Sequence, residues 1–402
     1  MLTERLLEES RAIAPRITAL RRAIHAEPEL GLETPLTLAK VRAELADLPL
    51  EWREGTTCTG AVAVLNKGKA GRSVLLRGDM DALPMDELTG LDFASTIPGR
   101  MHACGHDTHT AMLAGAARVL SARADELPGE VRFMFQPGEE GFHGARFMLR
   151  EGLLGGEGSD MALPDAAFAL HIMPNAPHAA VGGRAGTLLA AADMIDIAIE
   201  GRGGHASMPH DTRDPVPVAC EIVLALQTMI TRRFDAAEAA VVTITRLDAG
   251  SAHNIIADRA TLRGTMRTLT PGTRAAVQAD IRRVATNIAA AHDCVAEVTI
   301  TEGFPPTICD PRAVDLAEKV TTGMGGQFLG LDAPIMGAED FSYVIEKVPG
   351  AMCFLGVAPD GADWKTCCSI HSSRMMVDET VLPRGAAFLA GCATHFLAHG
   401  WD

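Results

Sequence analysis

Aromatic residues are scarce in this chain. Phe, Trp and Tyr together make up 4% of its 402 residues, and there is a single tyrosine. Glycine is abundant, with 39 residues, and small side chains suit closely packed layers of helices and strands. Charged residues make up 22% and hydrophobic residues 47%, a globular composition that excludes a disordered chain.

Basic residues are also in the minority. The chain has 36 Lys and Arg against 51 Asp and Glu, which gives a formal net charge of −15. Nucleic-acid binding depends on Lys and Arg that neutralise phosphates, so this balance argues against a nucleic-acid partner. An anionic substrate would need a local positive group, because the field of the whole protein repels it.

Cysteine pairs and long apolar runs are missing as well. The nine cysteines are odd in number and show no Cys-x-x-Cys pattern, which excludes a complete disulfide framework and favours a reducing compartment. No stretch approaches the 18 or more apolar residues that span a bilayer. The first sixteen residues are typical of an amphipathic helix and not of a signal segment. We therefore expect a cytoplasmic protein without a membrane partner.

The length predicts two domains, because 402 residues exceed one ordinary core. Residues 1–186 alternate strand-like and helix-like segments, which predicts an α/β sheet with helices on its faces and ligands at the carboxyl ends of the strands. The expected strands are 61–65, 73–77, 131–135 and 166–170, and the expected helices are 108–122 and 142–150.

A second pattern occupies residues 187–303. Its order of β-α-β-β-α-β is typical of a ferredoxin-like α+β unit. The segments are strand 193–199, helix 215–231, strands 240–247 and 260–268, helix 273–291 and strand 294–301. The α/β pattern resumes over 304–402 with a strand at 351–357 and a helix from Leu382, so the second domain is predicted to be inserted into the first.

Several groups of polar residues follow the predicted strands of the first domain. Asp79 and Asp81 come directly after one strand. They suit either a metal site, as ligands or as supports of ligands, or a plain acidic turn. Cys104 and His106 lead into a helix; a thiolate and an imidazole at this spacing can meet one transition-metal ion. His102 and His109 are expected to be solvated neighbours of this pair.

Two adjacent acids follow the next strand. Glu139 and Glu140 are either solvated or divide two tasks, one as a metal ligand and the other as a general base. His171 ends a strand and His371 stands late in the chain. A lone histidine in such a place is more often structural, whereas two that complete a ligand set are not.

Taken together, these motifs resemble the M20 metallopeptidase family, and within it the hippurate hydrolases, N-acyl-amino-acid amidohydrolases and plant auxin-conjugate hydrolases. The resemblance runs from about Leu20 to Asp378. It rests on Arg22-Ala23-Ile24-His25-Ala26-Glu27-Pro28-Glu29-Leu30, on 77–84, 101–107, 136–141 and 171–174, on Gly203-Gly204-His205-Ala206-Ser207, on 336–341 and on His371-Ser372.

The resemblance implies a metallo-exopeptidase-like catalytic domain that holds two divalent metal ions (Zn, Mn, Co or Ni) and an inserted lid that forms a homodimer or higher oligomer. Cys104 would bridge the metals. His106 and His171 would complete one ligand set, and Glu140 and His371 the other. Glu139 would be the general base.

The resemblance also assigns substrate contacts to the inserted domain, namely His205, Asn254 and Arg267, with His205 reaching the partner subunit's site. Arg267 could hold a substrate carboxylate through its planar donor fork or be a structural strand arginine. Asp81 matches a residue that orients a ligand in other branches of the family. Those branches have a His ligand where Asp79 stands, which leaves the roles of both aspartates open.

The predicted activity is metal-dependent hydrolysis of the amide bond of N-acyl amino acids. Water held by two divalent ions gives hydroxide near neutral pH, since its pKa falls towards about 7. Glu139 would take the proton and return it to the departing amine, while His205 would support the oxyanion. The alternatives are an M20-type dipeptidase or aminopeptidase, and a non-catalytic binding protein of the same fold.

Overall fold

The computed structural model describes residues 2–402, and these divide into two compact units. The main unit contains residues 2–188, 308–333 and 340–402; the inserted unit contains Leu189–Thr307 and Pro334–Glu339. The inserted unit thus begins two residues later and ends four residues later than the sequence patterns predict, and it gains a short segment from the later part of the chain.

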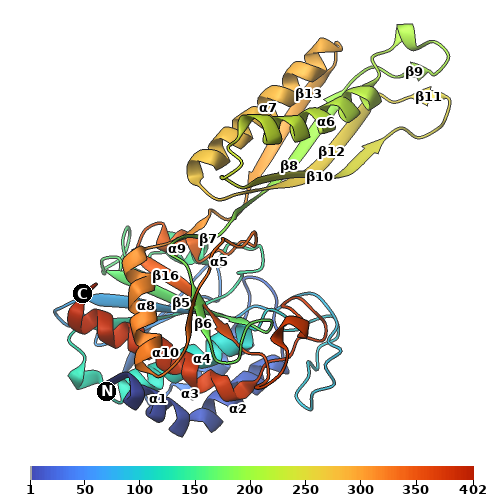
Figure 1. The fold of residues 1–402 in the computed structure, drawn as a ribbon. Coiled ribbons are helices and arrows are strands. Elements are labelled where there is room, and N and C mark those ends of the chain that lie inside the picture. The colour runs from blue at the N-terminus through green and yellow to red at the C-terminus, as the bar shows by residue number, and fades with distance from the viewer. Residues whose placement is uncertain (1) are drawn as a thin grey trace. The chain divides into compact units, whose positions relative to one another are not determined.

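The main unit is built on an eight-stranded mixed sheet in the order β1-β2-β4-β3-β5-β16-β6-β15. Figure 1 labels its strands β5, β16 and β6. Its four central strands, β4, β3, β5 and β16, are parallel neighbours, so their carboxyl ends meet at one edge of the sheet. The strands are β1 (Leu50–Glu54), β2 (Ala61–Leu65), β3 (Ser73–Asp79), β4 (Glu130–Gln136), β5 (Ala166–Met173), β6 (Val181–Gly183), β15 (Phe328–Gly330) and β16 (Gly350–Gly356).

Helices with small side chains pack against this sheet and against each other. α4 (His106–Ser121) contacts β3, α10 (Leu382–His399) contacts β3 and β5, and α8 (Pro311–Gly323) contacts β16. α1 (Leu2–Ala12) and α2 (Ala14–His25) contact α4 and α10 in turn. Alanine and glycine are frequent on α4 and α10, which lets helices approach closely and explains how a core with few aromatics is filled. The remaining helices are α3 (Pro35–Glu44), α5 (Gly144–Arg150) and α9 (Ser342–Ile345).

One described helix is long and apolar enough to cross a membrane by length and composition, in the segment Glu379–His399 around α10. The sequence expectation concerned uninterrupted apolar runs, and this segment contains Glu379, Arg384 and two histidines, so it passes on mean hydropathy alone. Packing explains its apolar composition, because 83% of the most apolar 18 residues is buried inside the fold. A helix that contacts neighbours on every side is apolar all round, and α10 is a core helix of the main unit.

The inserted unit has the ferredoxin-like order. Its antiparallel sheet runs β10-β12-β8-β13, and buried isoleucines of β8 pack with residues of both helices. Burial alternates along β8, so one face of the sheet meets the helices and the other is open. The elements are β8 (Ala191–Glu200), α6 (Pro215–Arg233), β10 (Ala240–Ala249), β12 (Arg259–Thr268), α7 (Pro271–Ala291) and β13 (Val295–Glu302).

Short elements complete the two units. β9 (Gly204–His205) pairs with β11 (Ile255–Ile256) in the inserted unit, and β7 (Gly186–Leu189) pairs with β14 (Thr307–Cys309) where the chain enters and leaves it. The single turns are η1 (Ala124–Glu126), η2 (Pro209–Asp211), η3 (Trp364–Thr366) and η4 (Glu379–Val381).

Gly78 in β3 yields a test of how closely α4 approaches the sheet. A Cβ at this position would lie 2.8 Å from the backbone oxygen of His109, and a backbone atom cannot rotate away. We expect Gly78→Ala to lower the free energy of unfolding by about 1–3 kcal/mol, measured by urea denaturation. Gly330→Ala is the control, because a Cβ there meets open space; equal losses for both variants would contradict this account of the packing.

Candidate metal centre

Donor side chains gather at the edge where the parallel strands end. Asp79 is the last residue of β3, His171 lies in β5, and Glu139 and Glu140 follow β4. β5 runs to Met173, three residues beyond the predicted end, so His171 belongs to the strand itself. Carboxyl ends of parallel strands are where open α/β sheets bind ligands.

Two sets of three side chains share one sulfur. Cys104, His106 and His171 form one set, and Cys104, Glu140 and His371 form the other; within each set the ligand atoms lie within 4.8 Å of one another. The Cys104 Sγ is 3.4 Å from His171 Nε2, and the His371 Nε2 is 3.3 Å from Glu140 Oε1. All five residues for which the resemblance implies metal ligation thus lie together.

The backbone around Cys104 is closely constrained. Gly105 has a φ of 85°, and a Cβ on it would lie 2.4 Å from the Ile172 side chain, so only glycine fits. The Gly105 turn leads directly into α4, which begins at His106. On the other side, the backbone N–H of His371 donates to the carbonyl of Ala103 at 2.7 Å. This bond ties the late segment that carries His371 to the residue before Cys104.

The donor set fits a divalent transition-metal ion. Both ring nitrogens of His106 are buried and make no hydrogen bond, although carboxylate oxygens of Asp81, Asp79, Glu139 and Glu140 lie 3.4–4.0 Å away. Burial raises the pKa of the Cys104 thiol, so the thiolate needs a nearby cation. Buried polar atoms without partners are costly, and sulfur, nitrogen and oxygen ligands suit zinc and its neighbours.

Glu139 lies beside the donor sets without belonging to the two that share Cys104. Its Oε2 is 3.9 Å from His106 Nε2, and the residue is buried. Together with Glu140 and His106 it forms a further close group. A carboxylate in this position can exchange a proton with a molecule at the centre while Glu140 faces His371.

Asp81 holds the loop that carries both glutamates. Its Oδ1 accepts the backbone N–H of Glu139 at 3.0 Å, and its Oδ2 accepts that of Glu140 at 3.1 Å. Both carboxylate oxygens are therefore engaged with the backbone, and the group is buried. The sequence left the role of Asp81 open, and these contacts indicate that it positions the turn that carries Glu139 and Glu140.

Asp79 and His109 form a second buried support, which the sequence interpretation missed. The Ile172 N–H donates to His109 Nε2 at 2.8 Å, so Nδ1 carries the proton and donates to Asp79 Oδ1 at 2.6 Å. Asp79 also pairs with Arg77. The expectation that His102 and His109 are solvated is wrong, since both are 1% exposed; polar neighbours such as Thr108 and Thr110 concealed a buried helix start.

Three comparisons with known proteins bear on this centre. The profile described as peptidase family M20/M25/M40 matches residues 75–395. The chain is 38% identical to IAA-amino acid hydrolase ILR1-like 2 of Arabidopsis thaliana, over 94% of this chain and 84% of that protein. It is 36% identical to N-acetylcysteine deacetylase of Bacillus subtilis, over 95% of this chain and 97% of that protein.

A solved structure of the same family is also similar to this chain. It is a Bacillus subtilis protein described as a dinuclear metal binding peptidase from the M20 family. The TM-score is 0.82 at 34% identity, over 96% of this chain and 99% of that one. The chain belongs to peptidase family M20. It is therefore a metal-dependent hydrolase of amide bonds, and it has the α/β fold of that family with an inserted α+β domain.

The inserted unit of this M20 hydrolase carries the three residues predicted to contact the substrate, and they lie at opposite ends of its sheet. His205 and Asn254 lie together, since the Ala206 N–H donates to the Asn254 carbonyl at 3.1 Å. Arg267 pairs in register with Ala192 near the start of β8, whereas His205 follows the end of β8 at Glu200. Eight strand residues span roughly 26 Å, so one copy cannot bring both ends to one small substrate.

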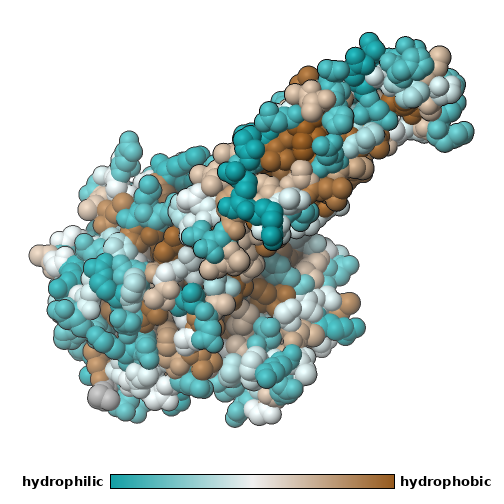
Figure 2. Space-filling model, turned by 45° about the horizontal axis from the view of Figure 1, so that its top comes forward, coloured by the Kyte–Doolittle hydropathy of each residue, from teal (hydrophilic) through white to brown (hydrophobic). Residues whose placement is uncertain are grey.

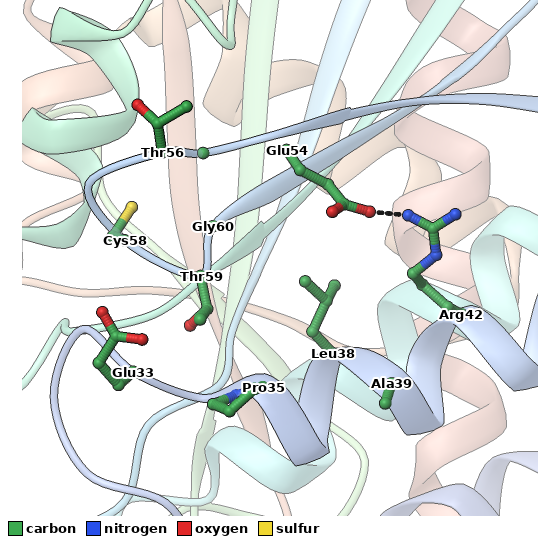
Figure 3. Close-up of a pocket in the computed structure, with 11 residues that line it drawn as sticks. Glu33, Pro35, Leu38, Ala39, Arg42, Glu54, Thr56, Cys58, Thr59 and Gly60 are labelled. Carbon is green, nitrogen blue, oxygen red and sulfur yellow. Dashed lines mark ion pairs between the residues drawn. The ribbon is translucent and has the colours of Figure 1, made fainter.

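A cavity elsewhere on the main unit is a poorer candidate for catalysis. About 530 Å³ in volume, it is lined by residues of α3 and of the 54–60 loop (Figure 3). Its Glu54 is paired with Arg42, burial raises the pKa of its Cys58 thiol, and no histidine lines it. A protonated thiol is a weak nucleophile, and among the described residues the carboxylates of Glu33 and Glu54 are the only other titratable groups besides Arg42 that line the cavity.

The single tyrosine and the start of α5 lie close to each other. Tyr343 is half-buried, and its hydroxyl hydrogen-bonds His143 Nδ1 at 2.9 Å. The helix expected from residue 142 begins at Gly144, because His143 precedes it with a φ of 60°.

Asp81 gives a direct test of the supporting geometry. Asp81→Asn keeps the size of the side chain but offers one acceptor instead of two, so one of the two glutamate N–H groups loses its partner. We expect kcat/KM to fall about 10- to 100-fold, as for other residues that orient metal ligands, with secondary structure retained by circular dichroism. Asp165→Asn is the control, since Asp165 likewise accepts a backbone N–H, from Ser73, at an exposed site. Unchanged kcat/KM in Asp81→Asn would contradict the assignment.

Proposed function

We propose that this M20 hydrolase cleaves the amide bond of N-acyl amino acids and releases a carboxylic acid and a free amino acid. The observation that carries the proposal is the pair of donor sets that share Cys104, with Glu139 beside them. Two relatives are named for such substrates, an IAA-amino acid hydrolase and an N-acetylcysteine deacetylase. The acyl group could be aromatic, as in hippurate, or small, as in N-acetyl amino acids.

We propose two divalent ions as cofactors, with Zn²⁺, Mn²⁺, Co²⁺ and Ni²⁺ as the candidates. Cys104 would bind both ions, His106 and His171 one of them, and Glu140 and His371 the other. When bound, such ions acidify a water molecule and polarise a carbonyl group. A thiolate ligand must stay reduced, which supports a cytoplasmic location.

Glu139 would handle the protons of the reaction. Its carboxylate accepts a proton from the attacking water and delivers it to the nitrogen as the amide bond breaks. Asp81 fixes the backbone of Glu139, so the loop that carries this carboxylate is already in place before the reaction. Arg267 would hold the substrate carboxylate, which supplies the local positive charge that an anionic substrate of a protein with net charge −15 requires.

We further propose that the working form is a homodimer in which His205 serves the partner subunit's site. His205 and Arg267 lie at opposite ends of one sheet, so both can meet one substrate only if they come from different copies. Among the described residues β10 pairs on one side alone, with β12, and α6 beside it exposes Leu224 by 69%. Figure 2 shows apolar surface over the helices of this unit. Two β10 edges related by a twofold axis would pair as antiparallel strands.

A peptidase activity is the second candidate, because the matched family is described as a peptidase family. The two activities differ in the group that the site receives on the amino side of the scissile bond. A dipeptidase or aminopeptidase binds a free ammonium group on the acyl part of its substrate, whereas the acyl part of an N-acyl amino acid, such as acetyl or benzoyl, carries no ammonium group. Rates on matched pairs such as N-acetylmethionine and a methionine dipeptide separate them.

The first test concerns Glu139. We expect Glu139→Gln to lower kcat on hippurate or N-acetylmethionine by about 100-fold or more, because an amide cannot accept the proton, while two metal ions per chain remain by elemental analysis. Chelation should abolish wild-type activity, and one of the four candidate metals should restore it. Wild-type protein with full metal that releases no amine from any acyl amino acid would refute the proposed function.

The second test concerns His205. Glu139→Gln and His205→Ala should each be nearly inactive, since loss of an oxyanion donor costs roughly a hundredfold. After subunit exchange, mixing the two should restore about a quarter of wild-type activity, because half of the dimers are mixed and each has one complete site. Mixing Glu139→Gln with the double variant is the control and should restore none. Absence of recovery when exchange is verified by co-purification of tagged chains would contradict a role in trans.

A further inference from the structure

The signature Arg22–Leu30 has no task in the mechanism above, and nor does Arg21 immediately before it. In the structure these residues end α2 and lie in the main unit. Arg21 and His25 are 2% and 1% exposed, which is unusual for residues that carry charge. The acidic residues that pair with these two side chains therefore indicate the role of this end of α2.

Two of the partners lie close in sequence to residues of the metal centre. The Arg21 Nε and the His25 Nδ1 donate to Asp107 Oδ2 at 2.7 and 2.8 Å, and Asp107 is the residue after His106. Arg21 and Arg22 donate to Glu379 at 3.0 and 2.6 Å, eight residues after His371.

The third partner is Glu87. Its Oε1 lies 3.1 Å from His25 Nε2, and its Oε2 accepts the backbone N–H of Ser95 at 2.7 Å. Glu87 thus organises the irregular segment 84–100, which leads directly to Cys104. Phe93 of the same segment covers the guanidinium groups of Arg21 and Arg22 at 4.8 and 4.6 Å.

The geometry fixes the protonation of His25. A carboxylate oxygen faces each of its ring nitrogens, and carboxylates only accept, so both nitrogens must donate. Burial lowers the pKa of His25, but the Asp107 and Glu87 carboxylates outweigh burial and raise it to about 9. The buried imidazolium of His25 therefore links Asp107, at the start of α4, to Glu87, in the irregular segment 84–100.

We propose that His25 is a positioning residue of the metal centre: with Arg21 it fixes Asp107 and Glu87, and through them the segments that present Cys104 and His106. The inference rests on the proposed function, since it assigns this task to a centre that binds metal. Glutamine at position 25 can donate to one of the two carboxylates only, and the other would be left buried without its cationic partner.

The test measures metal binding itself. Metal-free wild type, His25→Gln and Glu87→Gln are titrated with Zn²⁺ against a chromophoric chelator. Both variants should bind Zn²⁺ about tenfold more weakly, as when other supports of metal ligands are removed, and amides of 84–100 should exchange hydrogen faster. Glu130→Gln is the control, because it breaks a buried ion pair with Arg132 at the other end of β4; it should lower thermal stability and leave Zn²⁺ affinity unchanged.

Zn²⁺ affinity equal to wild type in His25→Gln would overturn the proposal; if that variant does not fold, unchanged affinity in Glu87→Gln would do so. Equal weakening in Glu130→Gln would also overturn it, because the effect would then be general destabilisation. Failure of the proposed function is a separate result: wild type would bind Zn²⁺ but hydrolyse no acyl amino acid, and the affinities would still decide the role of His25.

Discussion

The centre of this protein depends on burying a sulfur atom between two groups of donors. Cys104 takes part in both, and burial raises the pKa of its thiol. The thiolate form, buried beside a carboxylate, is stable only with positive charge close by. The parallel strands supply the neighbours from distant parts of the chain, and the left-handed turn at Gly105 sets the sulfur ahead of the helix.

Around this centre, most of the acidic side chains are occupied with holding other groups. Asp81 binds two backbone N–H groups, Asp79 binds Arg77 and His109, and Asp107 binds Arg21 and His25. Both oxygens of Asp81 are engaged with backbone N–H groups, whereas Asp79 also lies in a close donor group with His106 and His109. Glu139 and Glu140 are the two acids that the loop after β4 brings to the centre. Asp81 supports these two glutamates from behind the loop. Because it binds their backbone N–H groups, rotation of the glutamate side chains does not change this contact.

The sequence was sufficient for the fold class and for the order of the inserted unit, because hydrophobic periodicity and the strand-to-helix alternation are local signals. The grouping of Cys104, His106, Glu140, His171 and His371 came from the family resemblance, as no local pattern links residues 267 positions apart. Burial of His109 could not be predicted, since its polar neighbours imitate an exposed helix start. The task of Asp81 depends on a loop 58 residues away, and the core position of α10 depends on its surroundings and not on its composition.

The place of β16 affects how the chain can acquire its structure during synthesis. This strand lies between β5 and β6 in the middle of the main sheet, yet it is among the last elements to leave the ribosome. The inserted unit, by contrast, has all four strands of its larger sheet and both of its α-helices by Glu302. Its core can close while the main sheet still lacks a central strand, so the first compact body of the nascent chain is the insertion. The host domain, although it comes first in sequence, is completed last.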